Sequence, residues 1–342
     1  MKALNVSGHV RRLIPVPMRE HEIIEETSWR FFKMQTTTLT NTHGVSITTM
    51  TQGATWINWQ KPTVHSRQDL ILTSEPQVYL NDSSHHGHSI GPTGGRIPLT
   101  FQLAGQTVQV PDTGDGYNMH GGPDGFDTVA WDVSVGTDTV IYTHQFPAMV
   151  QPGTLSVTIQ YRLTDDDAVV ITYTATSTAP TLFNPTSHVY FNLGDTNNAN
   201  DHQLQINAQQ RIATAANKFP EAQNLPVANT GYDLRQLTPL ASVFDALKDI
   251  PERGLDDIYL LDTTQPAATL QCGDTQVTLS TDRNALVAYT ANNWDDALSL
   301  IGKTSGDHIG VALEPQYDPR DLAAYTLIPG DTAKYQTIYK LH

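Results

Sequence analysis

Leu155-Ser-Val-Thr-Ile-Gln-Tyr-Arg-Leu163 alternates apolar and polar residues, and the alternation resumes at Val169-Val-Ile-Thr-Tyr173 after the turn Asp165-Asp-Asp167. Because successive side chains of a strand point to opposite faces, this pattern predicts a hairpin with one buried and one exposed face. The buried face needs a second apolar layer to pack against. The segment therefore predicts an antiparallel sheet that forms one layer of a larger core.

The same alternation recurs on both sides of this hairpin. Strand-turn-strand patterns occupy residues 99–110 and 131–142, and an alternating segment at residues 335–341 closes the chain. One short helix is expected at Pro239–Ile250, where Val243, Leu247 and Ile250 fall on one side. Sheets with one apolar face pack face to face, so we expect an all-β fold, a large antiparallel β-sandwich with few short helices.

The length of 342 residues allows one large β-domain or two domains. Turn signals recur throughout and no Pro/Ser-rich linker divides the chain, so we predict a single β-sandwich domain over residues 34–342, with two domains as the alternative. Residues 1–33 contain the helix-forming run Glu20–Glu26 and lack the Thr-rich alternation that follows. We interpret them as an N-terminal extension whose role the sequence does not show.

Acidic residues dominate the charge, because 35 Asp and Glu against 20 Lys and Arg give a formal net charge of −15. This balance disfavours nucleic acid, an acidic membrane or a large anionic substrate as the partner, since each needs a basic surface. No apolar run approaches the ~18 residues of a membrane helix, and the N-terminus has no signal-peptide block, so a cytoplasmic location is expected. We expect a neutral small molecule as the partner, and a monomer or a homodimer.

Two histidines lie in segments suited to a ligand site. His120 precedes two glycines, whose backbone freedom allows its ring to project into a cleft, although a histidine that merely occupies a turn is the alternative. His188 lies in the aromatic segment Phe183–Leu193, where Asn192 and other polar residues can bond its ring or a ligand hydroxyl. A partly buried histidine titrates near neutral pH, as a general acid or base must, but a histidine satisfied within the core fits the same pattern.

Glu314 ends an apolar run and is followed by Pro315. A carboxylate in such surroundings is costly unless it is hydrogen-bonded or functional, and burial raises its pKa toward values useful in catalysis. A carboxylate and a histidine provide a base and an acid, which leaves the reaction class open.

The segment Gly91–Ile97 is rich in glycine and contains Arg96, whose guanidinium offers fixed donors to hydroxyl oxygens. His85, His86 and His88 precede it and suggest a metal site, but we do not favour one because they share a single polar loop without a second ligand cluster. Neither of the glycine-rich phosphate-binding patterns, G-x-G-x-x-G and G-x-x-x-x-G-K-[ST], occurs there.

Taken together, these segments resemble the aldose 1-epimerase (galactose mutarotase) family over most of the chain from about residue 36. The resemblance rests on the order and spacing of Gly87…Gly91…Arg96-Ile97, Met119-His120-Gly121-Gly122, Ser187-His188-Val-Tyr190-Phe191-Asn192-Leu193, Leu255-Asp256-Asp257 and Leu313-Glu314-Pro315-Gln316. It implies a galactose mutarotase-like supersandwich that interconverts the α and β anomers of a free sugar without a metal or other cofactor.

The resemblance also implies residue roles. Glu314 would be the general base at the anomeric hydroxyl, and His188 the general acid at the ring oxygen, because ring opening moves protons at two neighbouring oxygens. His120 would hold or polarise the same oxygens. Arg96 and Asp256 would bind sugar hydroxyls as donor and acceptor.

Gly95 and Asn192 complete the implied substrate-binding set. The chain departs from the family pattern at three positions: Gly95 stands where Asn is usual, Pro92 where Arg is usual, and Val287 where Gln is usual. These changes remove hydroxyl-binding groups and put the sugar preference in doubt, so an epimerase of the same family acting on a disaccharide such as maltose is an alternative.

A non-catalytic carbohydrate-binding β-sandwich is the rival from another class, but it does not need both His188 and Glu314. An epimerase for sugar phosphates would need a cluster of cations, and Arg96 stands nearly alone. A glycoside hydrolase usually needs two carboxylates across the scissile bond, so Asp256 would have to join Glu314 in that role.

Overall fold

The computed structural model describes residues 34–80, 84–148, 152–294 and 297–342. The predicted N-terminal extension, residues 1–33, lies outside the described residues. In the described part of the chain, no helix is long and apolar enough to cross a membrane.

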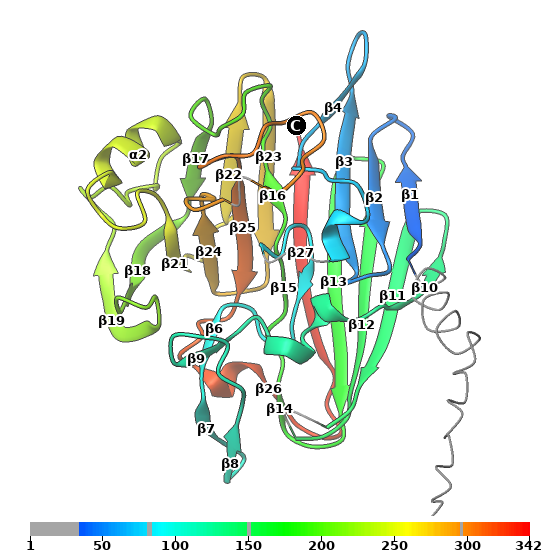
Figure 1. Cartoon of the computed structure of the whole chain (residues 1–342), viewed down its shortest axis with the longest axis vertical. Helices are drawn as coiled ribbons and strands as arrows, with labels where there is room; N and C mark the ends of the chain where they lie inside the picture. Colours follow the sequence, from blue (N-terminus) through cyan, green and yellow to red (C-terminus); the bar gives the residue numbers. More distant parts are fainter. Residues whose placement is uncertain (1–33, 81–83, 149–151, 295–296) are drawn as a thin grey trace, which may run out of the picture. The chain divides into compact units, whose positions relative to one another are not determined.

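The largest element is a nine-stranded antiparallel sheet, whose neighbouring strands from β10 to β27 are seen as adjacent arrows in Figure 1. Its strands in spatial order are β10 (Asp132–Val135), β11 (Thr139–Phe146), β12 (Leu155–Leu163), β13 (Ala168–Ser177), β27 (Ala333–Leu341), β23 (Thr275–Thr281), β22 (Ala268–Cys272), β17 (Gln203–Ile206) and β20 (Thr238–Pro239).

Two further antiparallel sheets supply the other layer. The six-stranded sheet runs β16 (Tyr190–Phe191), β25 (Val311–Gln316), β24 (Ala285–Tyr289), β21 (Asp256–Leu261), β18 (Ala208–Thr214) and β19 (Pro220–Pro226). The four-stranded sheet contains β1 (Thr36–Thr40), β2 (Ser46–Met50), β3 (Thr55–Pro62) and β4 (Arg67–Asp69).

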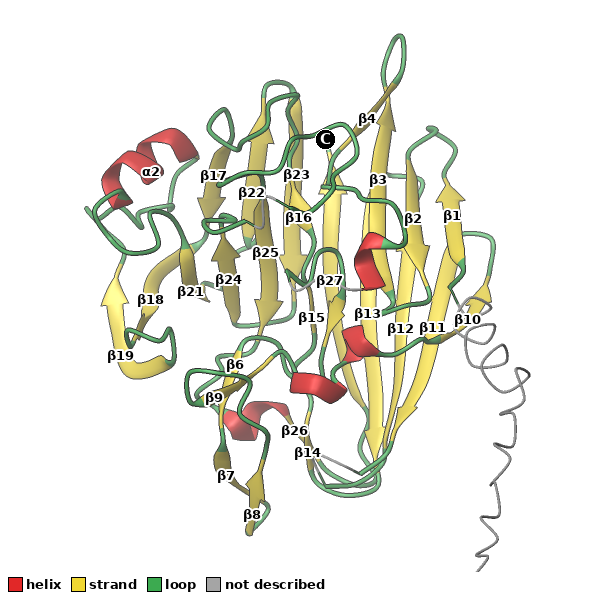
Figure 2. Cartoon of the chain, in the orientation of Figure 1, coloured by secondary structure: helices red, strands yellow, loops and turns green. Residues whose placement is uncertain are grey.

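Short elements connect these sheets, and Figure 2 shows how few of them are helical. Four strand pairs are β5 (Ser89–Ile90) with β15 (Thr186–Ser187), β6 (Arg96–Pro98) with β9 (Tyr117–Met119), β7 (Thr100–Leu103) with β8 (Gln106–Gln109), and β14 (Thr181–Leu182) with β26 (Thr326–Leu327). The helical turns are η1 (Val78–Leu80), η2 (Gly122–Asp124), η3 (Phe126–Thr128) and η4 (Leu322–Tyr325), and α2 (Leu240–Leu247) is the α-helix of the described residues.

The predicted all-β sandwich is confirmed, because one apolar core joins the nine-stranded sheet to the other two. Trp56 of β3 contacts Tyr339 of β27 with ring centroids 5.8 Å apart, and Tyr339 contacts Phe191 of β16 at 5.2 Å. The Tyr339 hydroxyl also donates to the carbonyl of Leu313 on β25 at 2.9 Å. Buried aromatic rings contribute more to such a core than their area alone, because their edges and faces attract.

The expected local elements are also present. The hairpin at residues 155–173 forms β12 and β13, residues 99–110 form β7 and β8, and residues 131–142 form the start of the β10–β11 pair. The predicted helix is α2, which buries Val243 and Leu247 and ends before Ile250. The final strand, β27, lies between β13 and β23 in the interior of the nine-stranded sheet, a position that alternation alone does not specify.

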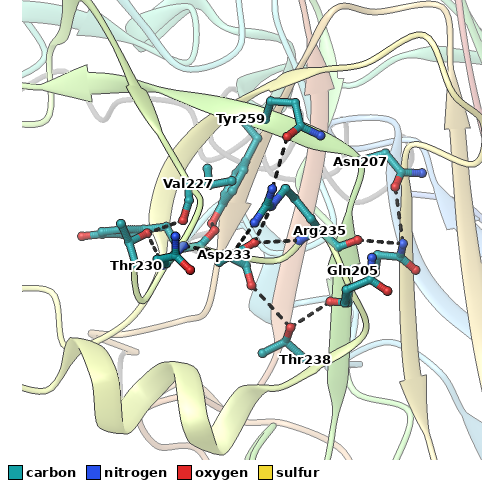
Figure 3. A network of polar contacts seen from close by, with 12 residues as sticks. Gln205, Asn207, Val227, Thr230, Asp233, Arg235, Thr238 and Tyr259 are labelled. Carbon is teal, nitrogen blue, oxygen red and sulfur yellow. Dashed lines mark hydrogen bonds and ion pairs between the residues drawn. The ribbon is translucent and has the colours of Figure 1, made fainter.

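A polar network supports the loop that precedes α2 (Figure 3). Arg235 donates to both carboxylate oxygens of Asp233 at 2.8 Å, and Thr238 donates to the Asp233 carbonyl. Gln205 of β17 donates to the Arg235 carbonyl at 3.1 Å, and the hydroxyl of Tyr259 on β21 donates to the carbonyl of Tyr232 at 3.2 Å. The network therefore fixes the loop between strands of both large sheets.

Candidate active site

A cavity of about 360 Å³ opens on one face of the six-stranded sheet. Strands β16, β25, β24, β21 and β18 all contribute to it, together with the loops that precede β5 and β6 and the end of β9. Its polar lining comprises Ser84, His85, Arg96, His120, His188, Tyr190, Thr214, Lys218, Glu252, Asp256, Tyr289, Asn292, Asn293, Trp294, Glu314 and Gln316.

Strand β25 presents Glu314 to this cavity. Its alternate residues Val311 and Leu313 belong to the sandwich core, so Glu314 points to the opposite face. Glu314 pairs across the sheet with Val287, and Val287 pairs with Ile258. Both apolar neighbours line the cavity beside Glu314.

His188 lies between β15 and β16, where two backbone hydrogen bonds fix it. Its amide donates to the carbonyl of His88 at 2.9 Å, and its own carbonyl accepts from the amide of Gly87 at 3.0 Å. These bonds extend the pairing of β15 with β5. As a result, the His188 Nε2 lies 3.4 Å from the Glu314 Oε1, and the two residues are only 6% and 3% exposed.

Burial, together with the charge of Asp256 and against the opposing charge of Arg96, raises the pKa of the Glu314 carboxyl to about 8. A carboxylate loses its hydration in such a site, so the neutral form is favoured. A pKa in this range matches a group that accepts and returns a proton near neutral pH.

His120 closes the ladder between β6 and β9. Its amide donates to the carbonyl of Gly95 at 3.0 Å, and its Nδ1 accepts from the amide of Gly95 at 3.3 Å. Burial, with the neighbouring His85, His188 and Arg96, lowers the pKa of the His120 imidazole well below its usual value. The ring is therefore neutral with its proton on Nε2, and it offers a hydrogen-bond donor.

The glycine after His120 is required by the fold. Gly121 has φ +85°, and a Cβ at this position would lie 2.1 Å from the carbonyl oxygen of Gly91. The loop carrying His120 thus approaches the loop before β6 closely, as only glycine permits. As expected from the glycines that follow it, His120 lines the cavity.

Arg96 and Asp256 both line the cavity and lie next to each other, with Arg96 Nη2 and Asp256 Oδ2 3.5 Å apart. This separation is long for a charge-assisted hydrogen bond, and the Arg96 Nε has no hydrogen-bond partner among the described residues. Asp257, the next residue of β21, points to the other face and pairs with Arg211 at 2.9 Å. Of the two adjacent carboxylates, only Asp256 lines the cavity.

The other predicted positions divide between cavity and core. Gly95 and Val287 line the cavity, whereas Pro92 does not. Asn192 is buried away from the lining, and its amide donates to the carbonyl of Ile309 at 2.7 Å and to that of Thr196 at 3.2 Å. The structure thus brings together six of the seven predicted site residues: Glu314, His188, His120, Arg96, Asp256 and Gly95.

The three loop histidines have separate partners. His85 Nδ1 lies 3.0 Å from an Asp127 carboxylate oxygen, His88 Nδ1 lies 2.7 Å from the Thr55 hydroxyl, and His86 stacks on Tyr79 with ring centroids 4.9 Å apart. Across the described residues, no three histidine, cysteine or acidic side chains are grouped as metal ligands.

His85 is a cavity residue that the sequence did not indicate as part of the acid–base site. Its ring lies 4.7 Å from that of His120 and 6.0 Å from that of His188. Trp294 is another, and packs edge-on against Tyr190 at 4.8 Å. A loop histidine beside a glycine-rich segment was visible in the sequence, but its pairing with Asp127 depends on the folding of two distant loops.

The fold and site together define a β-sandwich with a buried carboxyl–imidazole pair in a cavity that offers hydrogen-bond donors and acceptors from charged and neutral groups. Such a lining suits a small polar ligand whose protons are moved during reaction.

Comparison with known proteins identifies the family. Residues 35–340 match the sequence family described as aldose 1-epimerase. The chain is 33% identical over 295 residues to a maltose epimerase of Levilactobacillus brevis, covering 82% of this chain and 85% of that protein. It is 33% identical over 296 residues to the aldose 1-epimerase of Escherichia coli, covering 82% and 86% respectively.

The fold is also found in a solved structure of galactose 1-epimerase from Lactobacillus acidophilus NCFM, which is 25% identical. The superposition has a TM-score of 0.80 and covers 90% of this chain and 99% of that one. The chain belongs to the aldose 1-epimerase family, as its sequence motifs predicted. It is therefore an isomerase rather than a non-catalytic carbohydrate-binding sandwich.

Proposed function

We propose that this protein interconverts the α and β anomers of a free aldose by opening and reclosing the sugar ring, with Glu314 and His188 as the acid–base pair. The observation that carries the proposal is the 3.4 Å approach of the His188 Nε2 to the Glu314 Oε1 inside the cavity. The anomeric hydroxyl and the ring oxygen share one carbon, so two proton-transfer groups in contact suit their spacing.

The reaction begins with ionised Glu314 and protonated His188. Glu314 takes the proton of the C1 hydroxyl, the C1–ring oxygen bond breaks, and His188 gives its proton to the ring oxygen, which yields the open-chain aldehyde. Rotation about the C1–C2 bond presents the other face of the carbonyl. The hydroxyl on C5 then attacks C1 while His188 takes back its proton and Glu314 returns its proton to the carbonyl oxygen, so the enzyme is regenerated.

The remaining cavity groups bind and polarise the sugar. Neutral His120 donates from Nε2 to the ring oxygen or the C1 oxygen, because its Nδ1 already accepts from Gly95. Arg96 has a buried Nε without a partner in the described structure and can donate to a sugar hydroxyl, and the Asp256 carboxylate accepts from one. Fixed donors and acceptors of this kind hold the reacting carbon against the acid–base pair.

A disaccharide with a free reducing end is the second candidate substrate. The cavity continues past Asp256 to Thr214, Lys218 and Glu252, and the Lys218 ammonium pairs with Glu252 at 2.8 Å. This extension gives room and polar groups beyond the ring that reacts. The maltose epimerase of Levilactobacillus brevis and the aldose 1-epimerase of Escherichia coli are equally similar in sequence to this chain, at 33% identity each.

Polarimetry tests both candidates. Freshly dissolved α-glucose, α-galactose and α-maltose should each relax to the equilibrium rotation faster as enzyme is added, with the ratio of kcat/KM values giving the preference. Relaxation of all three sugars at the spontaneous rate would refute the proposed function. A kcat/KM for maltose well above those of the monosaccharides would favour the second candidate.

The domain boundaries, the cellular location and the oligomeric state are predictions. We propose that residues 34–342 form one catalytic domain, since every cavity residue lies within this range. A cytoplasmic location and a monomeric or homodimeric state are proposed from the sequence.

A further inference from the structure

Gln316 lies two residues beyond Glu314 on β25, so both side chains leave the same face of the strand. The Gln316 side chain lines the cavity, and the residue is only 1% exposed. Its cross-strand partner is Ala285, a small residue that leaves space beside the carboxamide.

The carboxamide of Gln316 is unsatisfied. Neither its Oε1 nor its Nε2 has a hydrogen-bond partner among the described residues. Nearby Asn184 shows the usual situation, because its Oδ1 accepts from Arg283 at 2.7 Å and from the Tyr317 amide at 2.9 Å. Buried amides are almost always bonded, so an amide with both ends open toward a cavity indicates a ligand group.

Two glycines keep this carboxamide accessible. A Cβ at Gly95 would lie 3.2 Å from the Gln316 Oε1 and 3.4 Å from its Nε2, and a Cβ at Gly94 would lie 3.3 Å from the Oε1. Gly95 also has φ +66°, a conformation that disfavours other residues. Any side chain at position 95 would therefore press against the amide and restrict its access to the cavity.

We propose that the Gln316 carboxamide is a specificity-determining group that binds a ring hydroxyl at C3 or C4 of the sugar. A hydroxyl both donates and accepts, as does a carboxamide through Nε2 and Oε1. Two residues along a strand span about 7 Å, so a sugar whose C1 hydroxyl lies at Glu314 brings its far side, rather than C2, to Gln316. The inference rests on the proposed function, which sets where C1 lies.

The test compares Gln316→Met, which keeps the side-chain length but removes both polar atoms, with wild type on glucose and on its 2-, 3-, 4- and 6-deoxy analogues. In the wild type, loss of the contacted hydroxyl should lower kcat/KM about tenfold relative to glucose, the size of one neutral hydrogen bond. In Gln316→Met, the 3- or 4-deoxy analogue should lose this penalty, while the 2- and 6-deoxy penalties stay unchanged. Taking the variant-to-wild-type ratio for each sugar cancels differences in intrinsic ring-opening rate.

Two further variants keep the test decisive. Gln102→Met, at an exposed position on β7, should behave as wild type with every sugar. Gly95→Ala covers the carboxamide without removing it, so it should abolish the same deoxy-sugar penalty even if Gln316→Met fails to fold. Unchanged penalties at C3 and C4 in both Gln316→Met and Gly95→Ala, or a changed penalty at C2 or C6 alone, would overturn the proposal.

Failure of this inference is distinguishable from failure of the proposed function. Calorimetric titration of the same five sugars measures binding without turnover, and should show the same tenfold loss at one position in wild type and none in Gln316→Met. If wild-type protein gave no rate enhancement, the proposed function would fail while these binding ratios would still decide the role of Gln316.

Discussion

Replacing Glu314 by Gln should make the protein more stable than wild type at high pH and much less active. A neutral amide of the same shape avoids the cost of a buried charge, but it cannot act as a base. In the wild type, burial moves the Glu314 pKa from 4.5 to about 8. The folded state therefore binds a proton that the unfolded chain has already released between these two pH values. Folding stability from this group is fully present below pH 4.5 and is lost as the pH rises to about 8.

The magnitude follows from the two pKa values. Each tenfold change in proton affinity corresponds to about 1.4 kcal/mol, so the total loss above pH 8 is about 5 kcal/mol. Between pH 5 and pH 9, the wild type should lose about 4 kcal/mol of unfolding free energy relative to Glu314→Gln. Titrating groups that do not contact residue 314 behave alike in both proteins and cancel in this difference.

Urea unfolding at pH 5 and pH 9, followed by tryptophan fluorescence, measures the effect. We expect Glu314→Gln to gain stability relative to wild type as the pH rises, while its mutarotation rate falls by roughly 10²–10⁴ because the base is missing. A stability difference that stays constant across this pH range would refute the reasoning that Glu314 is a desolvated carboxyl with a raised pKa.

Three other predictions concern the same cavity. His188→Asn should lower kcat by roughly 10²–10⁴ with the circular dichroism spectrum unchanged, and a wild-type rate would remove His188 from the mechanism. After subtraction of the spontaneous reaction, kcat/KM should rise with pH on the acid side of its profile, since the free enzyme needs ionised Glu314, and fall on the alkaline side, since it also needs protonated His188. A kcat/KM that is independent of pH between pH 5 and pH 9 would contradict this. Asp256→Asn should raise KM with little loss of stability. Asp257→Asn should leave KM unchanged and destabilise the fold by about 1–3 kcal/mol, because half-buried Arg211 loses its carboxylate partner. The reverse pattern in steady-state kinetics and urea unfolding would reject the assigned faces of β21.

Much of the fold was predictable because alternation reports directly which residues face a core. The β12–β13 hairpin was read from its own residues, and its register pairs Ile159 with Tyr173 and Tyr161 with Ile171. Alternation carries no information about which strands become neighbours across long connections. The insertion of β27 between β13 and β23 therefore had no local signal.

The candidate site was predictable to the extent that its residues lie in recognisable motifs. Glu314 and His188 are 126 positions apart, and the pairing of Tyr190 with Ala312 on β16 and β25 brings their strands together. Asn192 belongs to the same motif as His188, yet its side chain serves the backbone around Ile309. A motif shows that a residue matters, but strand direction and loop packing decide whether it faces a ligand.

Other site features have no sequence counterpart. The open carboxamide of Gln316 results from two glycines in a loop more than 200 residues earlier in the chain. The pairing of His85 with Asp127 likewise joins two separate loops. Such contacts depend on tertiary packing, which a single sequence does not report.

Magnetisation exchange between the anomeric protons tests the central claim most directly, because it observes both anomers at equilibrium. With catalytic amounts of wild-type protein, we predict exchange cross-peaks between the α and β H1 signals of glucose or maltose, with intensities that grow in proportion to enzyme concentration. With Glu314→Gln and with His188→Asn, these cross-peaks should be absent. Cross-peaks no stronger than in buffer for every aldose, or equally strong with both variants, would contradict the account.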